Sequence, residues 1–443
     1  MDNNPTITTK TQKIKINLKL ILQLAFPLIL LITLIPLQLT KIITFKWSPK
    51  YTNNNILSNN TQQFAAVTPP KPGLLPGPRT RKCDIFSGEW VPDPNAPYYT
   101  NTSCWAIHEH QNCMKYGRLD SEFMKWRWKP NECDLPLFNP SNFFEIVRGK
   151  SLAFVGDSVA RNQMQSLICL LSKVEYPIDV SNTKDENFKR WYYQSYNFTL
   201  ASFWTPFLVK AQENDPNGPT GTGIFGLHLD EPDTAWSAQI DDFDYIILSA
   251  GHWFFRSLMY YEKARLIGCR FCQISGVIEY TIEYGYRKAV RTAFRAILER
   301  RNLKGVVFLR TFAPSHFEGG EWNKGGNCLR KKPYKSRDIT LQGVDLDLYM
   351  AQLSEFKKAR KSGLRNGVKL KLIDMTRPML LRPDGHPSTY GHWPHENVTL
   401  YNDCVHWCLP GPIDNWNDFL LEMLWNEEKI VLHANSGGVR KFS

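Results

Sequence analysis

Three residues of this protein could together do covalent chemistry. They are a serine, a histidine far along the chain, and an aspartate three residues before the histidine. Ser158 stands in the tripeptide Gly156-Asp157-Ser158, and Asp403 and His406 form a D-x-x-H pattern. A serine hydroxyl attacks a carbonyl carbon only when a base takes its proton. A carboxylate beside the imidazole orients it and stabilises the imidazolium. The sequence therefore predicts acyl transfer through Ser158, with His406 as the base and Asp403 as its partner.

Two predicted elements place Ser158 at a sharp corner. The apolar run 151–155 is typical of a buried strand, and residues 159–171 show the apolar spacing of a helix. A serine between the two is lifted clear of the sheet, and the first amides of the helix point at any negative charge that forms there. At the other end of the chain, the spacing of Asp403 and His406 would put both on one helical turn.

Strands and helices alternate through the rest of the chain, which predicts an α/β fold with a parallel sheet between helices. Further strands are expected at 245–248, 306–309 and 370–373, and helices at 278–301 and 345–360. The second helix carries a predicted apolar stripe of Leu346, Tyr349, Met350, Leu353 and Phe356. Functional residues are expected at the carboxyl ends of the strands.

The amino-terminal region predicts a membrane anchor and a stem. Residues 20–40 hold no charge, and at about 1.5 Å per residue they span a bilayer core of about 30 Å. Lysines are more numerous before this segment than just after it, so residues 1–19 are expected to be cytosolic and the rest luminal, as in a type II single-pass protein. Residues 41–82 are rich in Asn, Pro and Gly and are expected to form a flexible stem.

The positive charge of the chain is concentrated in this amino-terminal region. The net charge is +12, and residues 1–82 contain 11 Lys and Arg and one acid, Asp2. The remainder is nearly neutral and carries no nucleic-acid-binding motif, which argues against a nucleic-acid partner. A nearly neutral luminal domain suits a neutral polymer better than a polyanion.

All ten cysteines follow residue 82, and an even number in a luminal domain is typical of disulfides. Two alternatives are less favoured: a redox pair at Cys269 and Cys272, and metal binding by Cys404, His406 and Cys408. No second Cys/His pair with zinc-ligand spacing accompanies either, so no metal is expected. Passage through the secretory pathway also fits four glycosylation sequons, at Asn59, Asn101, Asn197 and Asn397.

Residues 83–137 are rich in Trp and Cys and have only short apolar runs. We expect this segment to be a small subdomain that wraps the larger domain, 138–443, and is pinned to it by disulfides. Trp126, Arg127 and Trp128 could form a surface on which sugars stack. Packing of the same aromatic rings against the main sheet explains them equally well.

The order of the GDS and D-x-x-H motifs resembles that of the GDS-lipase/SGNH hydrolases. Over residues 83–432 the chain resembles the plant trichome birefringence-like proteins, a family of Golgi polysaccharide O-acetyltransferases. The sequence around CDIFSGEWVP and NTSCWAIHEHQNC is most similar to that of the branch that acetylates xyloglucan. The motifs that carry the family resemblance are Cys83-Asp84 with Gly88 and Trp90, KWRWKP at 125–130, CDLP at 133–136, VGDSVARNQ at 155–163, GGEWNKGGNC at 319–328, RPDGHPSTY at 382–390 and DCVHWCLPGPIDNW at 403–416.

The resemblance implies a reaction and its partners. Ser158 would become an acetyl-enzyme and pass the acetyl group to a hydroxyl of a cell-wall polysaccharide, with galactosyl side chains of xyloglucan favoured over xylan, mannan or pectin. The acetyl donor, or Golgi proteins that deliver it, would be a second partner of unknown identity, and no bound cofactor is expected. The protein would lie in the Golgi membrane with its catalytic domain in the lumen.

The resemblance also suggests supporting residues. The amides of Ser158 and Gly251 would hold the oxyanion, within a site that includes Gly156 and Asp157. Arg161 and Asn162 match the family's GDSxxRN pattern and would orient the site or supply a donor, although an ion pair of purely structural role is an equal alternative for Arg161. Substrate-binding candidates are His252, Trp253 and Trp407, with His252 standing where many SGNH hydrolases have an asparagine donor. Similar members of the family suggest the disulfides Cys83–Cys133 and Cys104–Cys169.

Two other functions use the same sequence features. Water as the final acceptor would make the protein a polysaccharide acetylesterase, and motifs do not separate this from a transferase because the choice depends on excluding water. A non-catalytic polysaccharide-binding protein would not need the three residues Ser158, His406 and Asp403.

Overall fold

The computed structural model describes residues 83–213, 223–272, 274–300, 302–303, 305–393 and 402–437. The expected cytosolic tail, membrane anchor and stem, and the sequons at Asn59 and Asn397, lie outside these residues. Within the described ranges, no helix has both the length and the hydropathy needed to cross a bilayer.

The main sheet has seven strands in the order β13-β12-β9-β3-β6-β5-β4. The five strands from β13 to β6 run parallel, while β5 is antiparallel to β6 and to β4. The parallel strands are β3 (Ser151–Gly156), β6 (Phe198–Trp204), β9 (Tyr245–Ser249), β12 (Val306–Arg310) and β13 (Lys369–Ile373), and the antiparallel edge is β5 (Arg190–Tyr193) and β4 (Ile178–Asp179). The predicted parallel sheet is therefore present, with an antiparallel edge that the sequence patterns did not predict.

The strand order reverses beside β3, the first of the parallel strands. The chain goes from β3 to β6 on one side and then to β9 on the other. A crevice forms outside the carboxyl ends of the strands where the order reverses, and this is the usual ligand site of open α/β sheets. Ser158 follows β3 and Gly251 follows β9, so both stand at this point.

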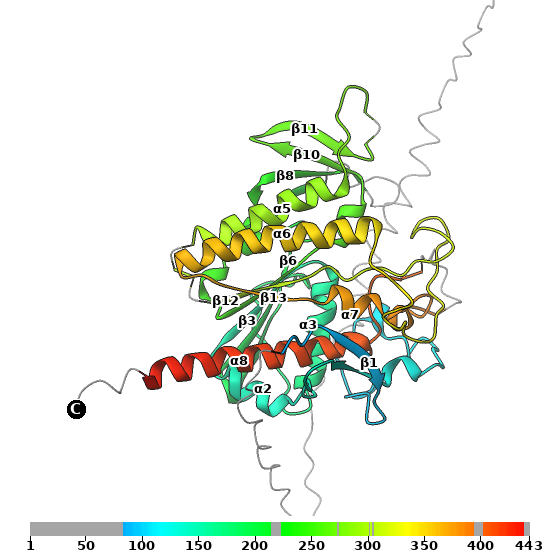
Figure 1. Ribbon diagram of the computed structural model, residues 1–443, viewed down its shortest axis with the longest axis vertical. Coiled ribbons are helices and arrows are strands. Elements are labelled where there is room, and N and C mark those ends of the chain that lie inside the picture. Colours follow the sequence, from blue (N-terminus) through cyan, green and yellow to red (C-terminus); the bar gives the residue numbers. More distant parts are fainter. Residues whose placement is uncertain are drawn as a thin grey trace, which may run out of the picture. The chain divides into compact units, whose positions relative to one another are not determined.

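Both faces of the main sheet are buried, as its continuous apolar strands predict. Alternate residues of β3 enter two different cores: Leu152 and Phe154 one, Ala153 and Val155 the other. The helices of the described chain are α2 (Pro140–Val147), α3 (Ser158–Leu171), α4 (Thr234–Ser237), α5 (Ile282–Leu298), α6 (Gly343–Asn366), α7 (Thr376–Leu380) and α8 (Asn415–Gly437). Figure 1 shows α5 and α6 side by side on one face, with α2, α3 and α8 on the other.

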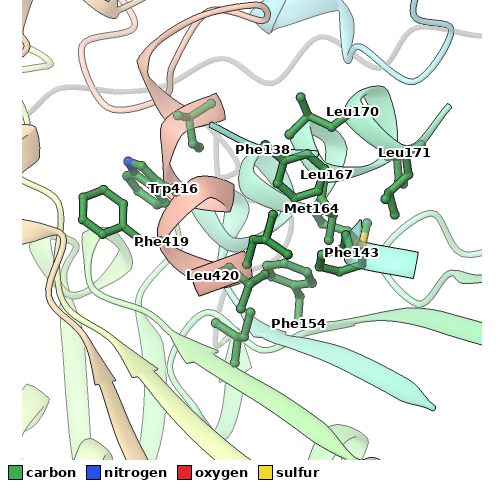
Figure 2. Packing of buried hydrophobic residues seen from close by; sticks show 14 of the residues in the cluster. Phe138, Phe143, Phe154, Met164, Leu167, Leu170, Leu171, Trp416, Phe419 and Leu420 are labelled. Carbon is green, nitrogen blue, oxygen red and sulfur yellow. The ribbon is translucent and has the colours of Figure 1, made fainter. Parts of the chain in front are cut away.

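The core beneath α3 is built from large side chains of several elements. Phe154 of β3 faces Met164 and Leu167 of α3, and Leu420 of α8 closes the group (Figure 2). All four are at most 4% exposed. Because α3 is packed in this way against the strand that precedes it, the position of Ser158 at its first residue is fixed by the core.

A second sheet, in the order β11-β10-β8-β7, was not predicted. Its strands are β7 (Val209–Glu213), β8 (Phe225–Pro232), β10 (Leu258–Glu262) and β11 (Arg265–Arg270). It packs on α5, where the Thr292 hydroxyl donates to the Leu229 carbonyl at 2.6 Å. These strands alternate buried with partly or fully exposed residues, so they lack the continuous apolar runs that revealed the main sheet.

The Trp/Cys-rich segment forms a two-stranded antiparallel sheet of β1 (Gly88–Pro92) and β2 (Trp126–Pro130). Trp128 is 3% exposed and its ring packs edge-on against Trp90. Trp126 is partly buried against the same core. Of the two readings of Trp126 and Trp128, the structure therefore shows packing.

Two predicted helices differ in detail from those observed. The helix expected at 278–301 is the shorter α5, which begins after Thr281, whose side chain accepts a hydrogen bond from the Tyr284 amide as an N-cap. The apolar stripe predicted for 345–360 is wrong in part, since Leu346 is 37% and Met350 51% exposed. The buried face of α6 instead includes Gln352, which accepts from the Phe312 amide, and Glu355, which pairs with Arg291.

Candidate active site

Ser158 is the first residue of α3 and directly follows the strand–helix corner. The side chain of Asp157 caps the helix by accepting from the amides of Val159 at 3.0 Å and Ala160 at 3.3 Å. The Ser158 amide has no helical carbonyl four residues before it. It is therefore one of the helix-terminal amides that can bind a group outside the helix.

Ser158, His406 and Asp403 form a hydrogen-bonded chain. Oγ of Ser158 lies 2.6 Å from Nε2 of His406, and Nδ1 of His406 lies 2.8 Å from Oδ2 of Asp403. The side chains of His406 and Asp403 are each 25% exposed, so the chain is held in place but open to a substrate. This is the geometry that an activated serine requires.

Electrostatics in this chain favour a charged pair of His406 and Asp403. Burial lowers the pKa of His406, but the charge of Asp403 and its hydrogen bond raise the pKa more, so the pKa lies above its ordinary value. Burial raises the pKa of Asp403, but His406 outweighs it and holds the pKa of this carboxyl well below its usual range. Asp403 is thus ionised at neutral pH and stabilises an imidazolium on His406.

The D-x-x-H segment is a turn and not the helical turn that its spacing suggested. Oδ1 of Asp403 accepts from the amides of Val405 at 3.1 Å and His406 at 2.9 Å, and the backbone of Asp403 pairs with that of Ser388. An aspartate that binds amides two and three residues ahead favours a turn over a helix. One carboxylate oxygen therefore shapes the loop while the other holds the imidazole.

Two disulfides flank this loop. Cys404 pairs with Cys328, and Cys408 pairs with Cys113 of the Trp/Cys-rich segment. His406 thus lies midway between two covalent attachments to distant parts of the chain. The sequence did not indicate these two pairings, and they leave neither Cys404 nor Cys408 free for a metal.

The other cysteines are paired as well. The structure contains Cys83–Cys133 and Cys104–Cys169, the two pairings that the family resemblance suggested. Cys269 and Cys272 form a disulfide with each other. No group of three or more metal-ligating side chains occurs in the described ranges.

Asn162 holds the loop of His406 from α3. Its side-chain carbonyl accepts from the Trp407 amide at 2.8 Å, and its side-chain amide donates to the Trp407 carbonyl at 3.3 Å. Asn162 is fully buried. Of the two roles considered for Asn162, the geometry shows orientation of the site.

The Gly251 amide has a partner other than the one predicted. It donates to Oδ2 of Asp157 at 3.1 Å, so it is occupied and does not face the crevice as an oxyanion donor. Asp157 therefore links the end of β9 to the start of α3. Burial raises the pKa of Asp157, while the charge of Arg310 at the end of β12 opposes this.

Gly156 allows β3 and β9 to approach at the corner. A Cβ at this position would stand 1.7 Å from the Ser249 carbonyl oxygen. No side chain fits there, so the glycine of the GDS motif is required by the contact with the neighbouring strand. The Asp157 amide also donates to the Ser249 carbonyl, at 3.1 Å.

Arg161 lies one helical turn after Ser158 and is partly buried. Its guanidinium lies 5.3 Å from the centre of the Trp204 ring and donates to Oδ1 of Asn187 at 3.1 Å. Its Nε is buried without a hydrogen-bond partner. Among the described residues Arg161 forms no ion pair, so the structural ion pair considered for it is not present.

The three predicted substrate-binding residues differ in their exposure. Trp407 is fully buried and its ring stacks on His386, so the prediction that Trp407 contacts a substrate is wrong. His252 packs against the Phe312 ring, and its Nε2 is buried without a partner. Burial, with the nearby charges of His406 and Arg310, lowers the pKa of His252 to about 3, so this ring is neutral.

Trp253 lines a cleft of about 630 Å³ together with Trp204 and Phe225. The cleft lies between the ends of β6 and β9 and the second sheet. Because Trp204 also contacts Arg161, the cleft adjoins the α3 surface that carries Ser158. Trp253 thus lines this cleft, and its contact with a substrate stays a prediction.

The sequence patterns did not indicate that His108, in the Trp/Cys-rich segment, interacts with residues of the candidate site. Burial and the charges of Arg161, His110 and His406 lower the pKa of His108 to about 4, so the electrostatics of His108 are coupled to two residues of the candidate site. Asn101 and Asn197, the asparagines of the two sequons within the described ranges, are partly buried and exposed, respectively. No local signal around His108 marks its proximity to residues 300 positions away.

Family models cover nearly all of the described chain. Residues 135–423 match a model described as a GDSL/SGNH-like acyl-esterase family found in Pmr5 and Cas1p, and residues 81–134 match the PMR5 N-terminal domain. The chain belongs to this acyl-esterase family. The two matches meet close to the boundary between the Trp/Cys-rich segment and the domain that carries Ser158.

Curated relatives place the chain among the trichome birefringence-like proteins. It is 62% identical to protein trichome birefringence-like 19 of Arabidopsis thaliana, over 78% of this chain and 82% of that protein. It is 61% identical to protein trichome birefringence-like 20 of the same plant, over 79% and 73%. It is 44% identical to xyloglucan O-acetyltransferase 4 of Populus trichocarpa, over 79% and 83%. The resemblance stated from the motifs is thereby confirmed.

Proposed function

We propose that this protein is an O-acetyltransferase that carries an acetyl group on Ser158 and transfers it to a hydroxyl of a plant cell-wall polysaccharide. The observation that carries this proposal is the hydrogen-bonded chain from Ser158 through His406 to Asp403 at 2.6 and 2.8 Å. Relatives at 44% and 42% identity that are named xyloglucan O-acetyltransferases support the reaction class.

In the first half-reaction, His406 Nε2 takes the proton of the Ser158 hydroxyl as Oγ attacks the carbonyl carbon of the acetyl donor. The tetrahedral intermediate collapses, the bond to the donor breaks, and the leaving group takes the proton from His406. Asp403 stabilises the imidazolium in between. The product is acetyl-Ser158 with a neutral His406.

In the second half-reaction, a sugar hydroxyl attacks the acetyl-serine while His406 takes its proton. Collapse returns that proton to Oγ of Ser158 and releases the acetylated sugar. We assign the oxyanion donors to the Ser158 amide and the Arg161 guanidinium, whose Nε has no partner in the structure. Losing one such donor typically lowers the rate by about 10²–10³.

We assign the acceptor to the cleft lined by Trp253, Trp204 and Phe225. Aromatic faces and edges suit the apolar faces of sugar rings, and such contacts depend little on salt. Xyloglucan with galactosyl side chains is neutral and is our favoured acceptor, whereas xylan and mannan are neutral alternatives and pectin is a polyanion.

The five disulfides support synthesis in an oxidising compartment. We infer a type II protein of the Golgi membrane, anchored through residues 20–40, with the chain from residue 83 onward in the lumen. The acetyl donor, or a protein that delivers it, is a second partner that remains to be named by experiment.

Product analysis tests the proposed function. The protein is incubated with an activated acetyl ester and one acceptor in each reaction. The acceptors are unacetylated oligosaccharides of galactosylated xyloglucan, xylan and homogalacturonan. We expect acetyl groups on galactosyl hydroxyls, with little change between low and physiological salt. Acetate released in place of acetylated sugar would identify an acetylesterase, and polymer binding without either product would identify a binding protein.

A further inference from the structure

Two buried histidines outside the candidate triad form a chain of hydrogen bonds that ends on the backbone of His406. His316 follows β12, and His386 lies in the RPDGHPSTY motif. Nε2 of His316 lies 3.0 Å from the Leu380 carbonyl oxygen, and Nδ1 of His316 lies 2.7 Å from Nε2 of His386. Nδ1 of His386 lies 2.7 Å from the His406 carbonyl oxygen.

The three contacts need three protons. A carbonyl oxygen only accepts, so the ring nitrogens facing Leu380 and His406 must both donate. Between the rings, one of the two facing nitrogens must donate to the other. Two neutral imidazoles carry two N–H protons in total, one fewer than the three contacts require.

With two protons, one of the contacts brings two lone pairs face to face at 2.7 or 3.0 Å. His316 is 7% and His386 1% exposed, so water does not readily replace the missing hydrogen bond. A buried polar atom without a partner is costly, and hydrogen bonds to a charged ring are stronger than neutral ones.

We propose that His316 and His386 share one extra proton, as an imidazole–imidazolium pair, and that this pair positions His406 by binding its carbonyl oxygen. Neither ring touches the reacting atoms, so both are positioning residues. The positioning role rests on the function proposed above, whereas the shared proton does not.

Charged groups of both signs act on the pair. Asp384 and Glu318 face His316 and favour its protonation, and Asp403 does the same for His386. Arg382 acts against protonation of His316, and Arg118, which donates to the His386 carbonyl at 2.8 Å, acts against that of His386.

Burial opposes the extra proton. It lowers the pKa of His316 to about 4 and that of His386 well below its ordinary value. The third hydrogen bond and the carboxylates act in the opposite direction. A shared proton at about pH 6 requires that the third hydrogen bond and the carboxylates together outweigh burial, and the pair loses this proton as the pH rises.

Both histidines of the pair also contact the loop of His406 directly. The His386 ring stacks on Trp407 with centroids 4.1 Å apart, and the His316 amide donates to the Cys404 carbonyl at 3.1 Å. The backbone of the loop is thus bound at Cys404, His406 and Trp407 at once.

Ring ¹⁵N NMR of the full-length protein, labelled at its ten histidines, tests the shared proton. At about pH 6, where an ordinary histidine is near its midpoint, we expect one ring of the pair with both nitrogens protonated. The signals are assigned by their loss in His316→Asn and His386→Asn. Two neutral rings at this pH would overturn the shared proton, whether or not the protein transfers acetyl groups.

Matched substitutions test the positioning. In His386→Asn the carboxamide can still donate to the His406 carbonyl, whereas in His386→Leu it cannot. We expect His386→Leu to lower kcat by about tenfold or more and His386→Asn to recover most of that loss. The His406 ring signal should shift in His386→Leu only. Equal kcat and an unshifted His406 signal in both variants would overturn the positioning role.

His316→Asn separates the charge from the hydrogen bond. Its side-chain amide can donate to Nε2 of a neutral His386, so the contact between the two side chains is kept without the extra proton. We expect the imidazolium signal of the pair to disappear, because a neutral carboxamide at this position cannot share the extra proton. An imidazolium signal on His386 that persists in His316→Asn would contradict a proton shared between the two rings.

Discussion

The side-chain amide of Asn162 binds both backbone polar groups of Trp407, at 2.8 and 3.3 Å. Ser158 and Asn162 stand four residues apart on α3, so one helix carries the candidate nucleophile and also holds the loop of its base. Helix α3 and this pair of hydrogen bonds therefore help to set the distance between Ser158 and His406, together with the disulfides of Cys404 and Cys408. Distortion of α3, or loss of the hydrogen bonds from Asn162, would move the Ser158 hydroxyl and the His406 ring apart.

Replacing Asn162 by alanine should weaken both stability and activity. The Trp407 amide and carbonyl would be left unpaired in a buried place, which costs about 1–3 kcal/mol of the free energy of unfolding. Urea unfolding measures this loss, and kcat should fall as the loop of His406 loosens. Asn366→Ala, at an exposed position of α6, is the matched control and should change the stability by less than about 0.5 kcal/mol.

Ser158→Ala and His406→Ala should each abolish acetyl transfer while the fold persists. Removing a member of such a triad lowers kcat by more than about 10³-fold. Ser362→Ala, on the exposed side of α6, should leave the rate unchanged. The test is acetyl transfer by each purified variant together with its melting temperature. A normally folded Ser158→Ala protein with near-normal turnover would rule out the acetyl-serine.

The pH dependence of kcat/KM should report His406. The base must be neutral to take a proton, so activity rises as the pH increases through the pKa of His406, which lies above its ordinary value. Asp403→Asn removes the charge that raises this pKa. We therefore expect the rising limb to move to lower pH in Asp403→Asn, with a much lower maximum. An unmoved limb would mean that Asp403 does not act through His406.

The same pair makes stability depend on pH in both directions. Because the folded pKa of Asp403 is depressed, its contribution is present above the unfolded pKa and is lost as the pH falls through the folded value. The raised pKa of His406 contributes below its unfolded pKa, and that part is lost as the pH rises through the folded value.

Removing the disulfide between Cys104 and Cys169 should destabilise the protein strongly. The bond closes a loop of 65 residues and ties the Trp/Cys-rich segment to α3. In the chain-entropy model, a loop of this size contributes about 4 kcal/mol. The double variant Cys104→Ala/Cys169→Ala should therefore unfold at a lower urea concentration. A midpoint equal to that of the unchanged protein would show that the core alone holds the segment.

The sequence located the elements around Ser158 closely. The predicted strand 151–155 and helix 159–171 differ from β3 and α3 by one residue each. A continuous apolar run and a regular helical spacing are local signals, and here the local preferences and the tertiary packing agree. The GDS and D-x-x-H motifs likewise identified three side chains that the structure brings within hydrogen-bond distance.

The supporting contacts could not be predicted because their partners lie far apart in the chain. Asn162 and Trp407 are 245 residues apart, and the Gly251 amide donates to Asp157, which lies 94 residues earlier in the chain. The prediction of an apolar stripe on α6 was wrong in part for a similar reason. Glu355 can be buried because Arg291 on α5 pairs with it, and no sequence pattern near Glu355 predicts that partner.

The order of the candidate residues along the chain has a consequence for biosynthesis. Ser158 is translated 248 residues before His406, and disulfides join the loop of His406 to Cys328 and Cys113 through Cys404 and Cys408. A nascent chain that ends before residue 403 carries the serine without its base. The candidate nucleophile and its candidate base therefore come together only after residues 403–408 have been synthesised and folded against α3.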